Sequence, residues 1–409
     1  MAGGHDDPSS LVPLVDQRRE VLRQIRPLEP IDVALLDAHG CVLAQDVVAP
    51  ENIPAFANSA MDGFAIRADA VDEGATFAIV GEVAAGSVTD RTVGPGEAIG
   101  IMTGASLPPG ANAVVPIEDV VLRGEHVTLS RTVTPGANIR PVGESARKGE
   151  KILRRQRVLG AADVGMLAAA GFASVRVHPR PRVAVISTGD ELVEPGEPLG
   201  PGKIRDANSY TLTAAARDAG ASSFRQMFVR DDPDALTDAF DGALASADLV
   251  VTSGGVSAGR YDFVAVVLAE IGSVEFRKVA MKPGMPQAFG FVSGVPVFGL
   301  PGNPVSAWVS FEIFVRPAIR RLQGRQDLNR PRVAAVLDEP IRSSAHRTEF
   351  VRVRLRRQPD GWHAAPTGAQ GSGILRSVVD ADGLAEIAPQ VRAVRPGQRV
   401  LVHVIDDQP

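Results

Sequence analysis

From Arg182 to Leu322 the sequence alternates short apolar runs with segments of helical periodicity, and this alternation restricts the possible folds more than any other feature. The apolar runs are "RVAVIST", "SFRQMFV", "DLVVTS" and "VEFRKVAM", and a final helical pattern extends from Pro304 to Leu322. Strands that are apolar along their whole length are buried on both faces, which is typical of parallel sheets covered by helices. We therefore predict a doubly wound, mainly parallel α/β sheet domain over residues 181–326.

The regions on either side of this domain have a different pattern. A helix pattern begins near Leu14 after two possible capping serines, and short β-type runs separated by Gly and Pro pairs continue to about Arg140. After the linker-like "QGRQDLNRPR" the chain returns to strand patterns. The predicted fold class is α/β plus β, with a helical N-terminal region over 1–180 that carries a β-rich insertion at about 50–140, and a C-terminal β-barrel over 327–409.

Composition excludes several classes of protein. The net charge of −5 gives no basic excess for nucleic acid, and no run of about 18 apolar residues exists to enter a membrane. Cys41 is the only cysteine, which rules out an intramolecular disulfide and a cysteine-rich zinc site and fits a reducing compartment. We expect a cytoplasmic protein with neither nucleic acid nor membrane as a partner.

Residues just after the predicted strands are the best candidates for a site, because open α/β sheets bind ligands at the carboxyl ends of their strands. The "GG" pair in "TSGGVSAGRYD" lets backbone N–H groups approach an anion, and Ser253 and Ser257 add hydroxyls. This loop matches neither the Walker A pattern nor G-x-G-x-x-G, but its composition suits phosphate. Candidate ligand-binding residues at these strand ends are Thr188, Asp190, Gly254, Gly255, Ser257, Pro301 and Asn303.

Acidic residues follow the same strands. Glu191 follows the first, Asp231 in "RDDP" the second, and Asp262 ends the glycine-rich loop. Carboxylates that converge on phosphate need a hard cation between them, so these three acids predict a magnesium site. Lys278 and Lys282 flank the next strand and are cationic partners for an oxyanion.

Each of these features alone has an ordinary explanation. A "GG" pair is typical of a turn, an Asp after a strand of a helix cap, and a lysine of the solvated surface. Asn303 likewise has the position of a cap for the last helix. The gathering of several such loops at one edge of one sheet favours a site.

Two stretches of the N-terminal half resemble tight turns in pattern but carry polar residues. They are "NSAMDGFA", which contains Asp62, and "IMTGA", which contains Thr103.

These motifs, together with "NIRPVGE", "STGDEL", "SGGVSAGRYDF", "MKPG" and "LPGNPVS", occur in the order found in molybdopterin molybdenumtransferases, the family that includes bacterial MoeA and the gephyrin E domain. The resemblance covers nearly the whole chain. It implies an elongated homodimer of four-domain chains. It also implies a reaction in which adenylylated molybdopterin and molybdate yield molybdenum cofactor and AMP with the help of Mg²⁺, and the upstream adenylyltransferase is then a possible partner.

The resemblance also implies roles for individual residues. It assigns Asp262, Asp231 and Glu191 to magnesium and the attacking water, Gly254, Gly255 and Ser257 to the phosphates, and Lys282 to molybdate. Asp62 and Thr103 would come from the second subunit. The full set implied to be catalytic is Asp62, Thr103, Glu191, Asp231, Asp262, Lys278 and Lys282.

Two positions depart from the family pattern. Met285 stands in "KPGMP" where the family commonly has Lys, and Ser145 follows Glu144 where it commonly has an acid. Two alternatives to the transferase are an adenylyltransferase built on the same sheet domain, and a non-catalytic pterin-binding scaffold. The chain's length disfavours the first, and the retained acids disfavour the second.

Overall fold

The computed structural model describes residues 10–69, 71–226, 228–256 and 263–405. The predicted site residues Ser257 and Asp262 lie outside these ranges. The chain divides into two compact units. The larger comprises Met1–Ile31, Gly40–Val42 and Val177–Pro409, and the smaller comprises Asp32–His39 and Leu43–Arg176.

The larger unit contains the predicted α/β sheet. Its strand order is β17-β14-β18-β22-β21-β19, in which the first four strands are parallel and the last two are joined by antiparallel pairing. The strands are β14 (Arg182–Ser187), β17 (Ser222–Arg225), β18 (Leu249–Ser253), β19 (Ser273–Lys278), β21 (Pro286–Val292) and β22 (Val295–Leu300).

The β21–β22 hairpin corrects the prediction for this part of the sheet. "VEFRKVAM" was expected to be the next strand of the alternating series, but β19 is an antiparallel edge strand and β22 takes the parallel place beside β18. Ser293 and Gly294 connect β21 to β22, and both have positive φ, as a two-residue hairpin turn requires. A strand pair with glycines and prolines in it lacks the regular apolar pattern from which the other strands were predicted.

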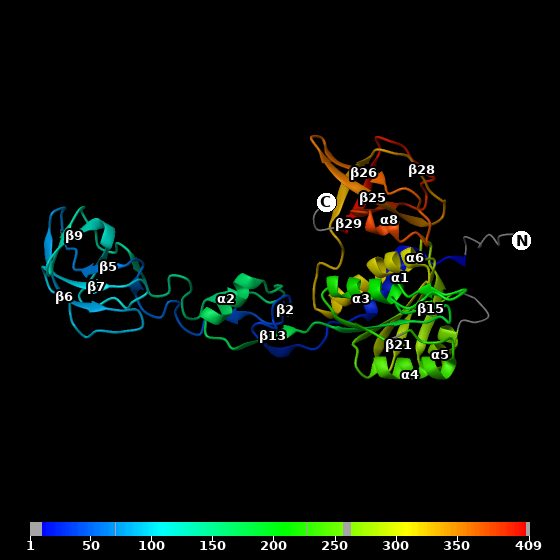
Figure 1. The fold of residues 1–409 in the computed structure, drawn as a ribbon, viewed down its shortest axis with the longest axis horizontal. Coiled ribbons are helices and arrows are strands. Elements are labelled where there is room, and N and C mark those ends of the chain that lie inside the picture. The colour runs from blue at the N-terminus through cyan, green and yellow to red at the C-terminus, as the bar shows by residue number, and fades with distance from the viewer. Residues whose placement is uncertain (1–9, 70, 227, 257–262, 406–409) are drawn as a thin grey trace, which may run out of the picture. The chain divides into compact units, whose positions relative to one another are not determined.

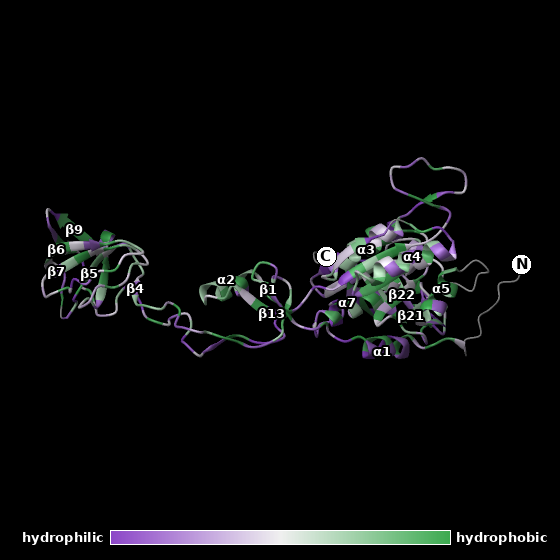
Figure 2. Cartoon of the chain, turned by 90° about the horizontal axis from the view of Figure 1, so that it is seen from below, coloured by the Kyte–Doolittle hydropathy of each residue, from purple (hydrophilic) through white to green (hydrophobic). Residues whose placement is uncertain are grey.

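Helices cover both faces of this sheet (Figure 1). Successive residues of β14 point to opposite faces, so Val183 and Val185 join one apolar core and Ala184 and Ile186 join the other. The first core includes side chains of α1, α3, α6 and α7, and the second includes side chains of α4 and α5. The labelled β21 and β22 are drawn mainly in the green of hydrophobic residues in Figure 2. The helices are α1 (Leu14–Gln24), α3 (Asn208–Asp218), α4 (Pro233–Leu244), α5 (Phe263–Ile271), α6 (Pro304–Ser310) and α7 (Arg316–Leu322).

Two helix predictions need correction. The first helix begins after Pro13, without a side-chain cap from the upstream serines. The last helix is not one continuous α-helix, because a π-helical segment at Phe311–Val315 separates α6 from α7.

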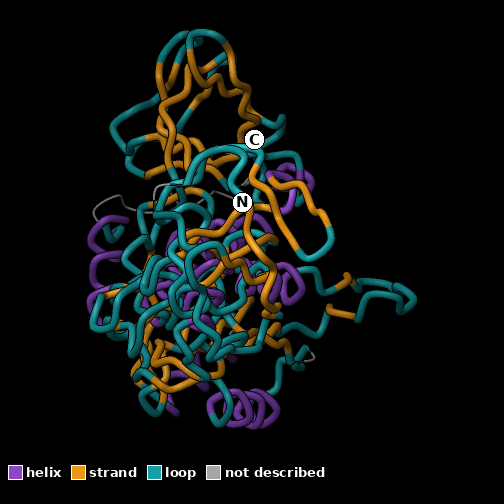
Figure 3. Tube along the Cα trace, turned by 90° about the vertical axis from the view of Figure 1, so that its left-hand side faces the viewer, coloured by secondary structure: helices purple, strands orange, loops and turns teal. Residues whose placement is uncertain are grey.

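The C-terminal part of this unit forms the predicted barrel, drawn mostly as orange strands and teal loops in Figure 3. β25 pairs with β26 on one side and β27 on the other, which closes the sheet β25-β26-β23-β29-β27 on itself. The short β20 (Met281–Lys282) adds to β25 and so ties the barrel to the α/β sheet domain. The strands are β23 (Arg332–Leu337), β25 (Thr348–Gln358), β26 (Gly361–Pro366), β27 (Gly383–Ile387) and β29 (Arg399–Val404), with β24 (Ile341–Arg342), β28 (Ala393–Val394) and helix α8 (Arg376–Val379) in the connections.

The smaller unit is rich in strands, as the sequence predicts. Its main sheet has the order β8-β5-β7-β6-β10-β9, and apolar side chains are buried on both of its faces. The strands of this sheet are β5 (Gly63–Ile66), β6 (Thr76–Val83), β7 (Glu97–Ile101), β8 (Ala113–Pro116), β9 (Val120–Arg123) and β10 (His126–Leu129).

Helix α2 (Ala161–Ala169) and several short strands complete the smaller unit. The sheet β1-β13-β2, most of whose residues belong to this unit, contains β1 (Ile31–Ala34), β13 (Ser174–His178) and β2 (Val42–Leu43). The remaining pairs are β3 (Val47–Val48) with β12 (Lys151–Leu153), and β4 (Asn58–Ser59) with β11 (Ile139–Arg140). In the parts of both units that are described, no helix is long and apolar enough to cross a membrane.

Candidate functional site

The carboxyl ends of three parallel strands lie side by side in the larger unit. Ser187 of β14 is in register with Ser253 of β18, and Ser253 is in register with Leu300 of β22. Next to these ends is a cavity of about 90 Å³. Its lining includes the predicted residues Thr188, Glu191 and Gly254, together with Asp206, Asn208, Ser253, Gly302 and Pro304.

The "GG" pair shapes one wall of this cavity. Gly254 and Gly255 have φ angles of +98° and +69°, which favour glycine. A Cβ on Gly254 would lie 3.0 Å from the carbonyl oxygen of Thr188, so glycine allows the loop after β18 to pack against the loop after β14. The two loops that the sequence singled out are therefore in contact.

Glu191 lies in the loop after β14. Its carboxylate folds back over Gly189, where a Cβ would collide with both carboxylate oxygens. No described residue forms a hydrogen bond or ion pair with this exposed carboxylate. Arg205 lines the same cavity, but within the described ranges it does not pair with Glu191.

Asp231 and Asp190 come from neighbouring loops. The strand before Asp231 was expected to extend to "RDDP", but β17 ends at Arg225. The chain then returns through a parallel bridge between Val229 and Thr188, which brings the backbone N–H of Asp231 to 3.4 Å from Asp190 Oδ1. The shorter strand thus still delivers both acids to the same edge of the sheet.

Two residues that the sequence analysis did not select organise this edge. Asp206 is fully buried and accepts hydrogen bonds from Ser187 Oγ at 3.1 Å and from the Ser209 N–H at 3.0 Å. Asn208 Nδ2 donates to Ser253 Oγ at 2.8 Å and to the Gly302 carbonyl at 2.7 Å. The signal was an Asp three residues before a Ser at the start of a helix pattern, which is typical of a cap.

These contacts change the expected roles of two other residues. Ser253 was expected to offer its hydroxyl to phosphate, but it is buried and its Oγ is engaged by Asn208 and the Pro301 carbonyl. Asn303 directly precedes α6, as predicted for a cap, but its side chain makes no capping hydrogen bond.

The two predicted lysines have different surroundings. Lys278 ends β19, which runs parallel to β22 through the intervening β21, so it lies at the same edge of the sheet as the cavity. Lys282 forms an ion pair with Glu349 of β25 at 2.8 Å. Burial alone would raise the pKa of Glu349, but Lys282 and the Ser344 N–H bring it below the ordinary value. The charge of Lys282 is therefore balanced within the protein.

Met285 lies near a second cation. Its Sδ is 4.0 Å from Nη1 of Arg347. A guanidinium thus lies beside the position at which the motif resemblance implies a lysine.

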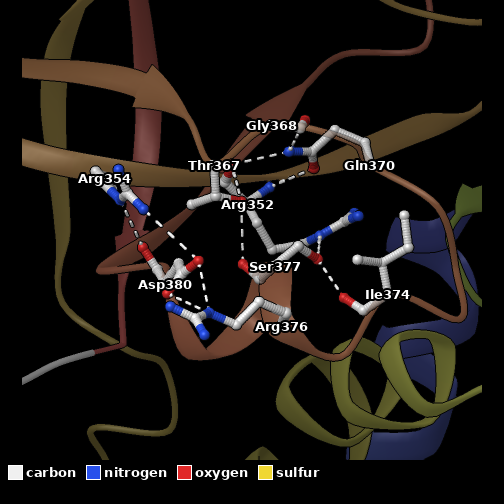
Figure 4. A network of polar contacts seen from close by, with 9 residues as sticks. All are labelled: Arg352, Arg354, Thr367, Gly368, Gln370, Ile374, Arg376, Ser377 and Asp380. Carbon is white, nitrogen blue, oxygen red and sulfur yellow. Dashed lines mark hydrogen bonds and ion pairs between the residues drawn. The ribbon is translucent and has the colours of Figure 1, made fainter.

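A buried guanidinium lies in the barrel (Figure 4). Arg352 is 1% exposed, and it donates to Ser377 Oγ at 3.2 Å and to the Gly371 carbonyl at 3.3 Å. Burial lowers its pKa to about 10, which outweighs the attraction of Glu349. The segment after Gly371 continues to Ser372, whose carbonyl accepts the N–H of Val305 in α6 at 3.0 Å. This segment therefore reaches the start of α6, whose first residue is the cavity-lining Pro304.

In the smaller unit, the structure brings Asp62 and Thr103 together. Asp62 Oδ1 accepts hydrogen bonds from the Thr103 N–H at 2.6 Å and from Thr103 Oγ1 at 2.8 Å. These bonds lower the pKa of Asp62 below its ordinary value. Gly63 continues the turn, and a Cβ there would collide with the Val115 carbonyl of β8. The two stretches that looked like separate turns are thus joined by hydrogen bonds, and the Asp62 side chain is exposed.

Within the ranges that the structure describes, no three His, Cys, Asp or Glu side chains gather as a metal-binding group. The proposed metal ligands Glu191 and Asp231 lie within those ranges, whereas Asp262 does not.

Comparisons with known proteins agree with the motif order. Three family models match the chain: "MoeA N-terminal region (domain I and II)" at residues 12–171, "Probable molybdopterin binding domain" at 184–321, and "MoeA C-terminal region (domain IV)" at 334–405. Molybdopterin molybdenumtransferase 2 of Mycobacterium tuberculosis is 42% identical over 95% of this chain and 98% of its own length. Molybdopterin molybdenumtransferase of Haemophilus influenzae is 34% identical over 96% and 98%.

A solved structure gives the same result. The molybdopterin biosynthesis MoeA protein of Pyrococcus horikoshii OT3 is 32% identical, covers 97% of this chain with 100% of its own, and superposes with a TM-score of 0.75. Identity above 30% over nearly the whole length extends through both units and the barrel. The chain belongs to the MoeA family.

Proposed function

We propose that this protein is a molybdopterin molybdenumtransferase, which takes adenylylated molybdopterin and molybdate and releases AMP and molybdenum cofactor. The relatives that bear this name align with it over nearly its whole length. The observation that carries the proposal is the contact between the Gly254 loop and the Thr188 loop beside Glu191, whose carboxylate has no hydrogen-bond or ion-pair partner among the described residues. A loop of glycine N–H groups suits a phosphate, and an adjacent unpaired acid suits a cation that accompanies it.

The donor set at this edge fits magnesium. Mg²⁺ prefers oxygen ligands and is commonly held by one or two carboxylates together with substrate phosphates, so a cluster of three protein ligands is not required. Glu191 and Asp231 are on adjacent loops, and we propose Asp262 as the third acid. When bound, the ion would neutralise charge on the phosphate oxygens. The acids of the chain would orient it and the attacking water.

We assign the other residues as follows. Gly254, Gly255 and Ser257 bind the phosphates with Thr188, Asp190, Pro301 and Asn303 around them, while Lys278 and Lys282 attract the molybdate oxyanion. Asp62 and Thr103 complete the site from the second subunit of a homodimer. The reaction takes place in the cytoplasm, where the upstream adenylyltransferase supplies the substrate.

The test is a direct assay. Purified protein is mixed with adenylylated molybdopterin, Mg²⁺ and molybdate, and AMP is measured. We expect release that depends on molybdate, and its absence would contradict the transferase. Asp262→Ala should abolish release while the protein keeps its oligomeric state, whereas unchanged turnover would remove Asp262 from the proposed role.

A further inference from the structure

The segment before α3 connects the ends of three neighbouring strands. Asp206 accepts a hydrogen bond from the hydroxyl of Ser187 at the end of β14. Asn208 donates hydrogen bonds to Ser253 at the end of β18 and to the Gly302 carbonyl just after β22. A short stretch of chain therefore braces the strand ends around the cavity. Such a brace fixes the positions of the Thr188, Gly254 and Gly302 loops relative to one another.

The same contacts fix which way the amide of Asn208 points. A hydroxyl such as Ser253 Oγ can either donate or accept, but the Gly302 carbonyl can only accept a hydrogen bond. The atom 2.7 Å from this carbonyl must therefore be the amide nitrogen. Both N–H groups of Asn208 are then used within the protein.

The amide oxygen is left over. Among described residues none donates to Asn208 Oδ1, and this atom is not one of the buried polar atoms that lack a partner, so solvent reaches it. Asn208 is half-buried and lines the cavity. Oδ1 is thus a pre-positioned acceptor that a ligand can use.

We propose that Asn208 Oδ1 accepts a hydrogen bond from a ribose hydroxyl of the adenylyl half of the substrate, which makes Asn208 a specificity-determining residue. This inference rests on the proposed function. Phosphate oxygens have no protons to donate, and the ribose hydroxyls are the nearest donors to the phosphate of a nucleotide. In other α/β folds a side-chain oxygen near a strand end reads a ribose hydroxyl while a glycine loop binds the phosphate.

The lining of the cavity agrees with this assignment. Gly254 of the proposed phosphate loop lines the same cavity, so a ribose there would adjoin its own phosphate.

The experiment measures binding rather than turnover. Affinities of the full-length protein for AMP, 2′-deoxy-AMP and 3′-deoxy-AMP are determined by titration calorimetry. We expect the wild type to bind AMP about three- to tenfold more tightly than one of the two deoxy nucleotides, the effect of one neutral hydrogen bond. In Asn208→Ala this preference should disappear.

The ratio of affinities is the measured quantity because Asn208→Ala also releases the two braced loops. Loss of the brace weakens the binding of all three nucleotides alike. Loss of Oδ1 removes only the preference for AMP over one deoxy nucleotide. Ser253→Ala is the matched control, since it removes one brace contact, keeps Oδ1 and should preserve the ratio. Asn208→Asp keeps an acceptor but places a carboxylate oxygen against the Gly302 carbonyl, so it should bind all three more weakly and retain the preference.

Three results would overturn the inference: no binding of AMP, equal wild-type affinities for the three nucleotides, or a preference that survives in Asn208→Ala. The assay for AMP release separates this failure from failure of the proposed function. Molybdate-dependent release without a ribose preference would leave the transferase standing and refute the role of Asn208. A ribose preference that depends on Asn208, found without any release of AMP, would support the role of Asn208 and contradict the transferase.

Discussion

Two turns, one in each unit, carry an acidic side chain, and they differ in the hydrogen bonds that its carboxylate receives. Asp62 in the smaller unit receives two hydrogen bonds from Thr103, and these hold its pKa below the ordinary value. Glu191 in the larger unit receives no hydrogen bond from the part of the chain that is described, although it lines a cavity. Asp62 thus has hydrogen-bond donors within its own unit, whereas the carboxylate of Glu191 has none among the described residues.

The difference indicates two kinds of function. A carboxylate held by a backbone N–H and a hydroxyl has a fixed direction and stays ionised, which suits an acceptor that orients a ligand. A carboxylate beside other acids, without a partner, gains its stabilisation when a cation or a donor arrives. Sites of the second kind reduce the stability of the folded protein until the ligand binds.

Of the two turns, the larger effect is expected at Glu191. Glu191→Ala should lower the rate of AMP release by roughly 10²- to 10³-fold, since a group that holds the cation near the reacting phosphate is removed. The same change should leave the free energy of unfolding unchanged within about 0.5 kcal/mol, because the exposed Glu191 carboxylate has no hydrogen-bond or ion-pair partner among the described residues. Turnover at saturating Mg²⁺ and the urea midpoint measure the two quantities.

Glu197→Ala is the control for this change. Glu197 is exposed in the same excursion of the chain, between β15 (Leu192–Val193) and β16 (Ile204–Arg205), and its backbone carbonyl rather than its side chain contacts Arg205. Its removal changes the net charge equally and should leave turnover unaltered. If both variants lose activity alike, the effect is one of general charge and Glu191 has no special role.

A smaller effect is expected at Thr103. Thr103→Val keeps the shape and the backbone N–H but removes the hydroxyl that donates to Asp62, so turnover should fall about tenfold, as for one charge-assisted hydrogen bond. Thr103→Ser keeps the hydroxyl and should stay close to the wild type. Equal activities of the Val and Ser variants would show that the hydroxyl does not matter.

The pH dependence of unfolding gives an independent check on the same pair. Because the folded pKa of Asp62 is lowered, its bonds with Thr103 contribute stability above the unfolded pKa of about 3.9, and this contribution is lost as pH falls through the folded value. The difference in unfolding free energy between wild type and Thr103→Val should therefore be largest at neutral pH and shrink in acid. A difference that is constant with pH would contradict the assignment to Asp62.

The elements with regular apolar patterns were predictable from the sequence. β14 and β18 contain the continuous apolar runs Val183–Ile186 and Leu249–Val251, and both are interior strands of the sheet with helices on both faces. β21 and β22 carry Gly290, Gly299 and two prolines, so their pattern did not indicate strands, and their places in the sheet depend on neighbours distant in sequence.

The site was predictable only as far as strand ends indicate it. Thr188, Glu191 and Gly254 follow strands and line the cavity, as expected from the fold. Asn208 and Asp206 precede a helix, and their importance comes from contacts with Gly302 and Ser187 that no local pattern reveals. The pairing of Lys282 with Glu349 likewise joins two segments that are distant in the sequence.

The smallest effect is expected at Met285, where the motif resemblance implies a positively charged lysine that this chain lacks. Met285→Lys places an ammonium group where the family commonly has one, and it should lower the half-saturating molybdate concentration two- to threefold, the effect of about 0.5 kcal/mol from a partly exposed charge. The gain is limited because the guanidinium of Arg347 already lies beside Met285. Met285→Leu, which keeps the volume without charge, should behave like the wild type. An unchanged molybdate requirement in Met285→Lys would show that Arg347 suffices there, and a matching decrease in Met285→Leu would show that packing rather than charge sets it.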